Sequence, residues 1–392
     1  MINKFNKNFI TKILFIRDGL LILNLPDKSV INIGNKNTQL TAELDVHSWK
    51  MFNRIVKSGS LGFAESYMNY EVSSPDISKV IYLFSINREH NKNIIYGKIF
   101  YNYWNYVKHL LKSNSRFGSK KNISHHYDLG NEFYRNWLDN SMTYSSAIFG
   151  LEKSNLKFAQ NNKYENICKI TNINNGDKIL EIGCGWGGFA EYAAKNYHAK
   201  ITGITLSKRQ AEYAKKRIFN QGLNDLVNIK LTDYRDIINK YDKIISIEMF
   251  EAVGEKYWPI FFKKLHDNIK DNGLIGMQLI SIKDDLYSSY KNNSDFIQKY
   301  IFPGGFLPSV KALYQITSSN KLNMKIEKSF AKDYANTLSI WKKRFLSNWD
   351  VISKDKQFND NFKRMWEYYL SYCEAGFLSG STDVHQIVLT KQ

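Results

Sequence analysis

Hydrophobic and polar residues follow two different patterns along the chain. Short apolar runs separated by Asp-Gly and Pro-Asp turn pairs predict a small β unit over residues 12–36. Residues 46–70 follow a helical period with a glycine break at SGSLGF, and a second helix, DISKVIYLFSI, is predicted to begin near Asp76. We therefore expect a smaller α+β domain in the N-terminal part of the chain.

From residue 176 onward, predicted strands alternate with predicted helices. Strands are expected over five apolar runs: 178–183, 199–205, 227–231, 243–248 and 273–282. Helices are expected over 188–197 and from a cap at Ser207. An insertion over 284–320 precedes a strand LNMKIEKSF, an aromatic helical segment over 334–378 and a last strand DVHQIVLTK. Such alternation predicts an α/β fold with a parallel, doubly wound sheet.

The segment between these two parts changes character along its length. Residues 91–120 begin as an aromatic helical pattern and end in a polar, basic link, SNSRFGSKKN. The aromatic band Tyr96–Tyr106 fits either a packed helix face or an amphipathic surface that meets lipid. We place the domain boundary in the link, which gives domains over residues 1–115 and 116–392.

A glycine-rich turn follows the first strand of the α/β part, in KILEIGCGWGG. A strand, a glycine turn and a helix form the opening of a nucleotide-type crevice. An NAD site requires an acid at the end of the second strand, but that strand ends in Thr205-Leu206. Instead, Glu181 precedes the glycines and Asp233 follows the third strand. An acid beside the glycines repels phosphate and favours a cationic ligand with an amino-acid tail and an adenine, which indicates S-adenosylmethionine (SAM).

Composition narrows the class of protein further. The chain has 392 residues, 43% of them hydrophobic, and is long enough to bury a core. Its net charge of +18 favours an anionic partner, either nucleic acid or an acidic membrane surface, although solvated lysines explain it equally well. Three cysteines and no expected secretory signal indicate a reducing, intracellular protein. No run approaches the roughly 20 apolar residues of a spanning helix, so any membrane association is expected to be peripheral.

The histidine pair His125-His126 invites a metal hypothesis. Adjacent histidines point in different directions on a helix, and no cysteine or third histidine lies nearby at ligand spacing. We expect no metal site. The polar-aromatic run TYSS, at residues 143–146, fits a loop that closes over a site.

A set of ordered motifs from about residue 124 onward resembles one known family. The motifs are HYDLGNEFY, TYSSAIF, EIGCGWG, GITLS, FEAVG, FPGG and LPS. Together they resemble the cyclopropane-fatty-acyl-phospholipid synthase family, and within it the subgroup with plant-like cyclopropane synthases and fatty-acid methyltransferases. The resemblance implies a class I SAM-dependent methyltransferase domain, and residues 1–115 are similar to the N-terminal domain of larger members, which implies a lipid- or membrane-associating role.

The resemblance also implies a reaction and a base. Carbon is transferred from SAM to the cis double bond of unsaturated acyl chains in membrane phospholipids, and a carbocation then loses a proton to give a cyclopropane; methylene or methyl-branched chains are the alternative product. In the family the base is thought to be a bound bicarbonate. Its holders here are Glu251, Gln278, Tyr334 and backbone groups near Ser146 and Ile280.

Three features of this site qualify the resemblance. The family often has Cys at Ser146 and His at Gln278, and an uncharged amide weakens the case for a bound anion. Glu251 also fits a helix N-terminal acid that interacts with the helix dipole. Cys373 matches a position assigned in the family to an active-site cysteine, and cysteine is equally a common buried residue.

The resemblance assigns the cofactor residues by position. Gly183, Gly185 and Gly187 admit the methionine portion beside Glu181, with Cys184 and Trp186 in the same turn. The remaining contacts are a cover from Tyr144 and Ser145, ribose partners Thr205, Leu206 and Gln210, and adenine neighbours Asp233, Tyr234 and Arg235.

Two rival functions remain open at this stage. Nucleic-acid methylation is suggested by the charge, but no basic-aromatic recognition module or NPPY-type loop is present, so no nucleic-acid partner is expected. A non-catalytic lipid-binding protein is the second rival. The expected partners are unsaturated phospholipid acyl chains and an anionic membrane surface at the inner face of the membrane, reached from the cytoplasm, and a homodimer is a further hypothesis.

Overall fold

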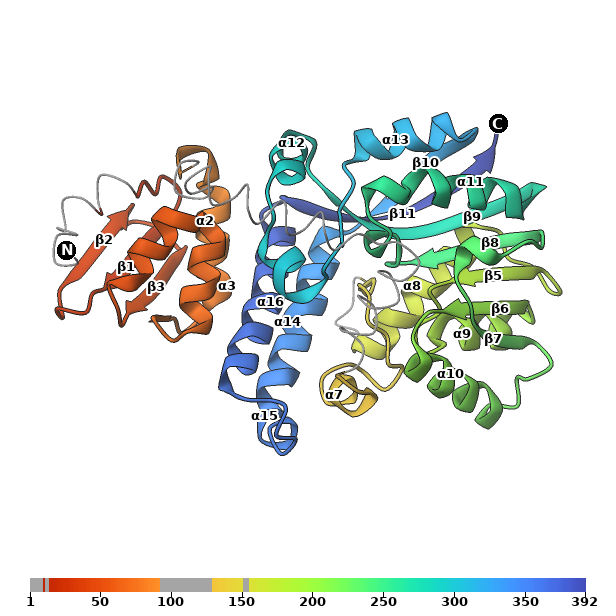
Figure 1. Cartoon of the computed structure of the whole chain (residues 1–392), viewed down its shortest axis with the longest axis horizontal. Helices are drawn as coiled ribbons and strands as arrows, with labels where there is room; N and C mark the ends of the chain where they lie inside the picture. The colour runs from red at the N-terminus through yellow and green to blue at the C-terminus, as the bar shows by residue number, and fades with distance from the viewer. Residues whose placement is uncertain (1–9, 11–13, 92–128, 151–154) are drawn as a thin grey trace. The chain divides into compact units, whose positions relative to one another are not determined.

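The computed structural model describes residues 10, 14–91, 129–150 and 155–392 (Figure 1). The chain divides into two compact units. One contains residues 1–111, 288–301 and 341–381, and the other contains residues 112–287, 302–340 and 382–392. Two late segments are thus grouped with the N-terminal part of the chain. The predicted boundary at 115/116, the aromatic band and the histidine pair lie outside the described residues, and the boundary stays a prediction.

The first unit contains a four-stranded sheet. Its strands are β1 (Leu20–Asn24), β2 (Val30–Gly34), β3 (Thr41–Val46) and β4 (Val72–Ser73), in the order β2-β1-β3-β4. β1 and β2 form an antiparallel hairpin, which confirms the predicted β unit. β3 pairs parallel with β1 and was missed, although Ala42, Leu44 and Val46 alternate inward along it.

Helices cover this sheet. α2 (Lys50–Met68) has non-helical dihedrals at Gly59, with φ of 58°, which confirms the predicted glycine break. α3 (Ile77–Ile86) begins where a helix start was predicted, and the Asp76 side chain caps it by accepting hydrogen bonds from the backbone amides of Ser78 and Lys79. α16 (Asp360–Leu378) packs against α2 and α3. The unit also contains the 3₁₀ turn η1 (Arg88–Asn91), a π-helical turn η5 (Ile297–Ile301) and α15 (Trp349–Ile352).

The second unit is built on a seven-stranded sheet. Its strands are β5 (Lys178–Ile182), β6 (Lys200–Thr205), β7 (Val227–Leu231), β8 (Tyr241–Ile247), β9 (Ile269–Ile282), β10 (Leu322–Ser329) and β11 (Thr382–Lys391). Their order is β10-β11-β9-β8-β5-β6-β7 (Figure 1). The sheet is mostly parallel, as predicted, but β11 runs antiparallel to both β9 and β10. A strand can be parallel to its predecessor only if the connection returns the chain to the edge of the sheet where that predecessor began. β11 instead begins at the edge where β10 ends, so the two strands are antiparallel.

Helices alternate with these strands. They are α7 (Asn131–Arg135), α8 (Leu156–Ile170), α9 (Gly188–Tyr197), α10 (Lys208–Asn220), α11 (Trp258–Asn268) and α13 (Val310–Ser319), with 3₁₀ turns η2 (Tyr234–Asp236), η3 (Phe250–Ala252) and η4 (Glu255–Tyr257). The chain passes between the two units within α12 (Asp284–Asn292) and within α14 (Ala331–Ser347). The predicted cap of α10 is confirmed, because Ser207 Oγ accepts a hydrogen bond from the Gln210 amide at 3.3 Å.

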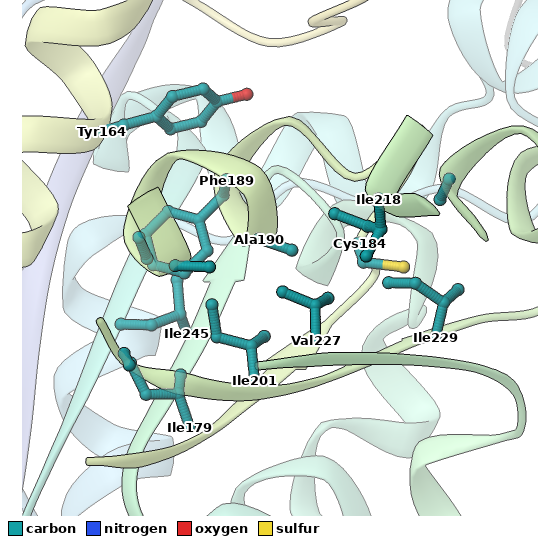
Figure 2. Close-up of a cluster of buried hydrophobic side chains, with 14 of the residues drawn as sticks. Tyr164, Ile179, Cys184, Phe189, Ala190, Ile201, Ile218, Val227, Ile229 and Ile245 are labelled. Carbon is teal, nitrogen blue, oxygen red and sulfur yellow. The ribbon is translucent and has the colours of Figure 1, made fainter. Parts of the chain in front are cut away.

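A hydrophobic core fixes α8, α9 and α10 against one face of the sheet. Figure 2 shows Ile179, Ile201 and Val227 of the strands facing Phe189 and Ala190 of α9. Each fully buried large side chain contributes about 1.5–3 kcal/mol. The short alanine side chains of α9 let the helix lie close to the sheet, so the turn that precedes it is held rigidly.

No helix among the described residues is long and apolar enough to cross a membrane. Within the same residues, no group of three or more His, Cys, Asp or Glu side chains has the arrangement of a metal site.

Candidate active site

The glycine turn after β5 forms an open cradle. Gly183, Gly185 and Gly187 all have positive φ, at 81°, 51° and 81°. A Cβ on Gly183 would lie 2.5 Å from Met249 Cγ, whereas a Cβ on Gly185 would meet no atom within 4 Å. The turn is anchored because the amides of Gly183 and Cys184 both donate to Ile204 O at 2.9 Å. The open side at Gly185 leaves room for a ligand against the backbone.

Glu181 supplies a buried acid beneath this cradle. Its side chain is buried, and its Oε2 atom has no hydrogen-bond partner. Burial raises the pKa of Glu181 to about 8, against the opposing charges of Arg217 and Lys163. A buried acceptor without a partner is costly unless a donor completes it. The cationic amino-acid end of SAM supplies both a donor and a compensating charge, so these residues fit SAM.

The remaining residues of the turn, Cys184 and Trp186, are both buried. Cys184 packs into the core beside Gly203, and burial raises the pKa of its thiol. Trp186 Nε1 donates to Asn131 Oδ1 at 2.8 Å. Its ring lies 5.0 Å from that of Tyr134, within an aromatic cluster that also contains Trp137 and Tyr144. These side chains therefore shape the walls of the site.

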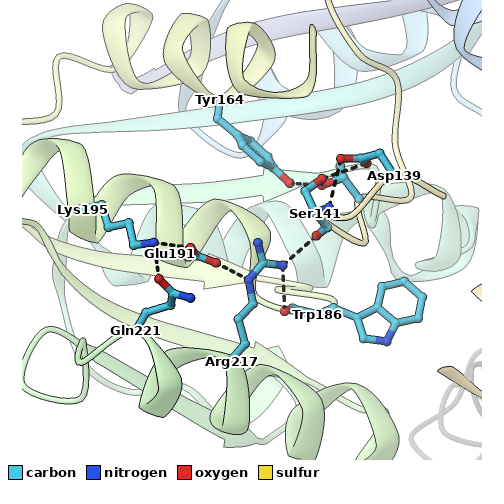
Figure 3. Close-up of polar contacts among 9 residues, drawn as sticks. Asp139, Ser141, Tyr164, Trp186, Glu191, Lys195, Arg217 and Gln221 are labelled. Atoms are coloured by element: carbon cyan, nitrogen blue, oxygen red, sulfur yellow. Dashed lines mark hydrogen bonds and ion pairs between the residues drawn. The ribbon is translucent and has the colours of Figure 1, made fainter. Parts of the chain in front are cut away.

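Arg217 ties the cradle to the segment before α8. In Figure 3 its guanidinium bridges the carbonyl oxygens of Ser141 and Trp186 and pairs with Glu191. Ser141 is fixed in turn by Asp139, to which its hydroxyl donates at 2.8 Å. The turn and the predicted covering segment are thus connected through the half-buried guanidinium of Arg217.

The predicted ribose and adenine residues lie at the carboxyl ends of β6 and β7. Thr205 Oγ1 donates to Gln210 Oε1 at 3.0 Å, and Leu206 is half-buried beside them. Asp233 accepts from Arg235 through the backbone amide at 2.9 Å and through Nη2 at 2.6 Å. Ligands bind at this edge of open α/β sheets.

Lys163 on α8 is a buried cation that sequence reasoning missed. Its Nζ donates to Ser145 Oγ and Gln160 Oε1, both at 2.6 Å. Burial lowers the pKa of Lys163 to about 7, while the charges of Glu248, Asp139 and Glu181 oppose that change. The signal that could have revealed it is a lysine in helical spacing with the buried face of α8.

Glu248 is the second missed residue, and it is the central acceptor of the site. It follows β8 directly and has a φ of 48°, a conformation that costs a residue with a Cβ roughly 1 kcal/mol. Its Oε1 atom accepts from the Ser146 amide at 2.8 Å and from Gln278 Nε2 at 2.7 Å. Tyr334 Oη donates to its Oε2 atom at 2.5 Å. An acid at the carboxyl end of a central strand was the available signal.

The orientation of the Gln278 amide is set from the neighbouring strand. Gln386 on β11 lies directly opposite Gln278 on β9, and its Nε2 donates to Gln278 Oε1 at 3.0 Å. Asn166 Nδ2 donates to Gln386 Oε1 at 2.6 Å. This chain of amides leaves the Gln278 NH₂ group as the donor toward Glu248.

Glu251 occupies a different environment. Its Oε1 atom accepts from the Ile280 amide at 2.6 Å, and its Oε2 atom is buried without a partner. Burial and, to a smaller extent, the charge of Glu248 raise the pKa of Glu251 to about 8. Burial also raises the pKa of Glu248, but its three donors and the charge of Lys163 oppose this rise. The donors therefore favour the proton on Glu251 and the negative charge on Glu248.

The structure therefore brings Ser146, Gln278, Ile280, Tyr334 and Glu251 together, but not around a shared anion. All the donors that the resemblance assigned to bicarbonate end on Glu248 or Glu251. The Ser146 hydroxyl donates to Ala147 O, so only its backbone amide takes part. This donor set does not fit an additional bicarbonate.

Cys373 lies on α16, which is grouped with the other unit. Burial raises the pKa of its thiol, with a smaller contribution from Asp295. A catalytic role for Cys373 stays a prediction.

The fold and the cradle define a class I SAM-dependent transferase. The model of the family "Mycolic acid cyclopropane synthetase" matches residues 114–387, and the chain belongs to this family. The chain is 35% identical to the cyclopropane-fatty-acyl-phospholipid synthase of Escherichia coli K12 over 390 residues, which cover 94% of this chain and 95% of that protein.

Two further relatives bear on the product and the cofactor. The tuberculostearic acid methyltransferase of Mycobacterium tuberculosis is 35% identical over 353 residues, covering 86% of this chain and 81% of that protein. A mycolic acid cyclopropane synthase solved with SAH and CTAB superposes with a TM-score of 0.65 and 28% identity, covering 69% of this chain and 98% of that chain.

Proposed function

We propose that this enzyme transfers a one-carbon unit from SAM to the cis double bond of unsaturated acyl chains in membrane phospholipids and forms a cyclopropane ring. The observation that carries the proposal is the position of the Glu248 carboxylate. The next residue, Met249, packs against Gly183 of the cofactor cradle. A carboxylate held by three donors therefore lies beside the SAM cradle, and the reaction needs both SAM and a group that accepts a proton or holds one that does. The similarity to the Escherichia coli synthase over nearly the whole chain supports the same substrate class.

SAM, when bound, supplies an electrophilic methyl group. The open backbone at Gly185 would admit SAM, and the Glu181 carboxylate would bind its cationic amino-acid end. Tyr144 and Ser145 close the site from the preceding segment, where the Ser145 hydroxyl is held by Lys163. Thr205 and Asp233, at the ends of β6 and β7, would hold the adenosine portion.

Burial of the polar groups around Glu248 serves the chemistry. Ser146, Gln278 and Tyr334 are all buried. A carbocation on the acyl chain reacts with any water that reaches it, so a closed site protects it. The same burial strengthens the electrostatic attraction between the cation and the Glu248 carboxylate.

A second product is favoured by one comparison. The tuberculostearic acid methyltransferase is as similar to this chain, at 35% identity, as the Escherichia coli synthase. In both cases the cation loses a proton from the transferred methyl group. A cyclopropane results when the C–H electron pair closes a three-membered ring, and a methylene branch results when the pair forms a new double bond. A saturated methyl branch needs an additional reductant.

The site of action is proposed to be the cytoplasmic face of an anionic membrane, with peripheral attachment. The net charge of +18 supports this, and the three cysteines are free, as expected in a reducing compartment. Binding to vesicles of anionic phospholipid that weakens as salt rises supports attachment; equal binding to neutral vesicles argues against it. A homodimer stays a hypothesis for sedimentation analysis.

The function is tested with SAM and vesicles of dioleoyl phosphatidylglycerol. The expected result is release of S-adenosylhomocysteine with a matching gain of one CH₂ in the oleoyl chains by mass spectrometry. Methyl transfer to RNA with no change in the lipid would instead support the nucleic-acid alternative. SAM binding without any transfer would support a lipid-binding protein.

A further inference from the structure

We propose that the Glu248 carboxylate is itself the base of the reaction and makes a bound bicarbonate unnecessary. This inference rests on the proposed function and names the proton acceptor for it.

Three hydrogen-bond donors converge on the Glu248 carboxylate. Glu248 accepts from Ser146 N, Gln278 Nε2 and Tyr334 Oη at 2.8, 2.7 and 2.5 Å. These donors come from three segments, 102, 30 and 86 residues away along the chain. Backbone and side-chain donors fixed in this way hold a carboxylate in one orientation.

The backbone of Glu248 has an unusual conformation. Its φ of 48° is a conformation that favours glycine, and its amide donates to Gln278 O at 2.7 Å. Strained conformations persist where the surrounding structure determines them, commonly at functional sites. At Glu248 this conformation accompanies a side chain that accepts three hydrogen bonds.

The two carboxylates differ in their donors. Glu251 has one backbone donor and a partnerless Oε2 atom, and is the group favoured to hold a proton. Glu248 has three donors, which together with the charge of Lys163 oppose the rise in its pKa caused by burial, and is the group favoured to be ionised. Two neighbouring acids whose environments separate them in this way take different roles.

The charges around Glu248 disfavour an additional anion. Lys163 opposes the charges of both Glu181 and Glu248. An added bicarbonate would place another anion among these acids without a remaining donor from Ser146, Gln278, Ile280 or Tyr334. Desolvating an unpaired anion is strongly unfavourable.

The step balances without an added reagent. The π electrons of the acyl double bond form a C–C bond to the transferred methyl as its C–S bond breaks, and a cation remains on the neighbouring acyl carbon. A Glu248 oxygen then removes one proton from the new methyl group, and the C–H electron pair closes the ring. The proton leaves Glu248 to solvent before the next turnover.

The first test needs no variant. Turnover of dioleoyl phosphatidylglycerol by the full-length protein is measured in buffer depleted of CO₂ and again with added bicarbonate. Equal rates are expected. A large loss of rate that bicarbonate restores would overturn the proposal.

The second test uses two substitutions. Glu248→Gln is expected to lower kcat by about 10²- to 10⁴-fold, the usual contribution of a general base. Glu248→Gly relieves the backbone conformation and exposes the three donors, and added bicarbonate or formate is expected to restore part of its rate. A Glu248→Gln enzyme with the wild-type rate would contradict the inference.

The control is Glu165→Gln on α8, because Glu165 also accepts from tyrosine hydroxyls, those of Tyr192 and Tyr197. Its rate is expected to stay within about twofold of wild type, since it lies outside the site. SAM affinity, measured by calorimetry, verifies that each variant is folded. If the glycine variant does not fold, the wild-type and glutamine results still decide. A wild-type protein that makes no product contradicts the proposed function itself, and the base with it.

Discussion

Removing the Tyr334 hydroxyl is expected to weaken the base in a way that depends on pH. Tyr334 Oη donates to Glu248 Oε2 at 2.5 Å, and this bond stabilises the ionised carboxylate. A hydrogen bond to a charged group contributes about 1.5–3 kcal/mol. The loss in Tyr334→Phe therefore raises the pKa of Glu248 by about one to two units, since one unit corresponds to about 1.36 kcal/mol.

The sign of the effect follows from the role of Glu248. A higher pKa means that the carboxylate is protonated over a wider range of low pH, so the acidic limb of the kcat profile moves upward by about one to two units. The rate falls about 10- to 100-fold below that limb and recovers as the pH rises through it. Lys163 and Glu251 also face Glu248, so the profile is interpreted as a difference from wild type.

The assay is S-adenosylhomocysteine release at saturating SAM across pH. Tyr192→Phe is the matched control, because Tyr192 Oη also donates to a glutamate, Glu165, at 2.8 Å, away from the site. A Tyr334→Phe enzyme with an unshifted limb, or with a higher KM for SAM and the same kcat, would refute a hydroxyl that acts through Glu248.

Two other predictions concern the cofactor acid Glu181 and Gln386 on β11. The pKa of Glu181 is raised from 4.5 to about 8, so Glu181 holds a proton below that pH and must lose it when cationic SAM binds. SAM affinity should therefore rise with pH up to about 8 and level off above it. Lys163 and Arg217 also face Glu181. In the Glu181→Gln variant, SAM affinity measured by calorimetry should not change with pH; a pH dependence like that of the wild type would mean that another group titrates. In Gln386→Leu the Gln278 amide oxygen loses the donor that lies 3.0 Å away. Because this is a hydrogen bond between neutral groups, kcat should fall about 5- to 10-fold while the KM for SAM stays unchanged. A change in KM alone would contradict the proposed role of Gln386 in orienting Gln278.

Local patterns in the sequence were sufficient for much of the fold. The helix break at Gly59, the helix start near Asp76 and the cap at Ser207 depend on residues within a few positions, and each was predicted correctly. The direction of β11 was missed, because it depends on where the chain re-enters the sheet. Strand β3 was missed although its alternation was visible.

The acid-base centre was only partly predictable. Glu251, Gln278 and Tyr334 were found by resemblance, and the structure does bring them together. Glu248 was not found, because its partners come from 30 to 102 residues away and no local pattern reports their convergence. Lys163 was missed because a single lysine on a helix is normally solvated, and only the tertiary fold buries it.

The central claim is that an acyl chain gains its carbon from SAM at this site. The most direct measurement is NMR of dioleoyl phosphatidylglycerol after incubation with the protein and SAM labelled with carbon-13 in its methyl group. The expected result is label in a ring CH₂, with proton signals at the high field typical of cyclopropanes. Label in a methylene or methyl branch would support the alternative product. An unlabelled lipid beside a protein that binds SAM would contradict the claim.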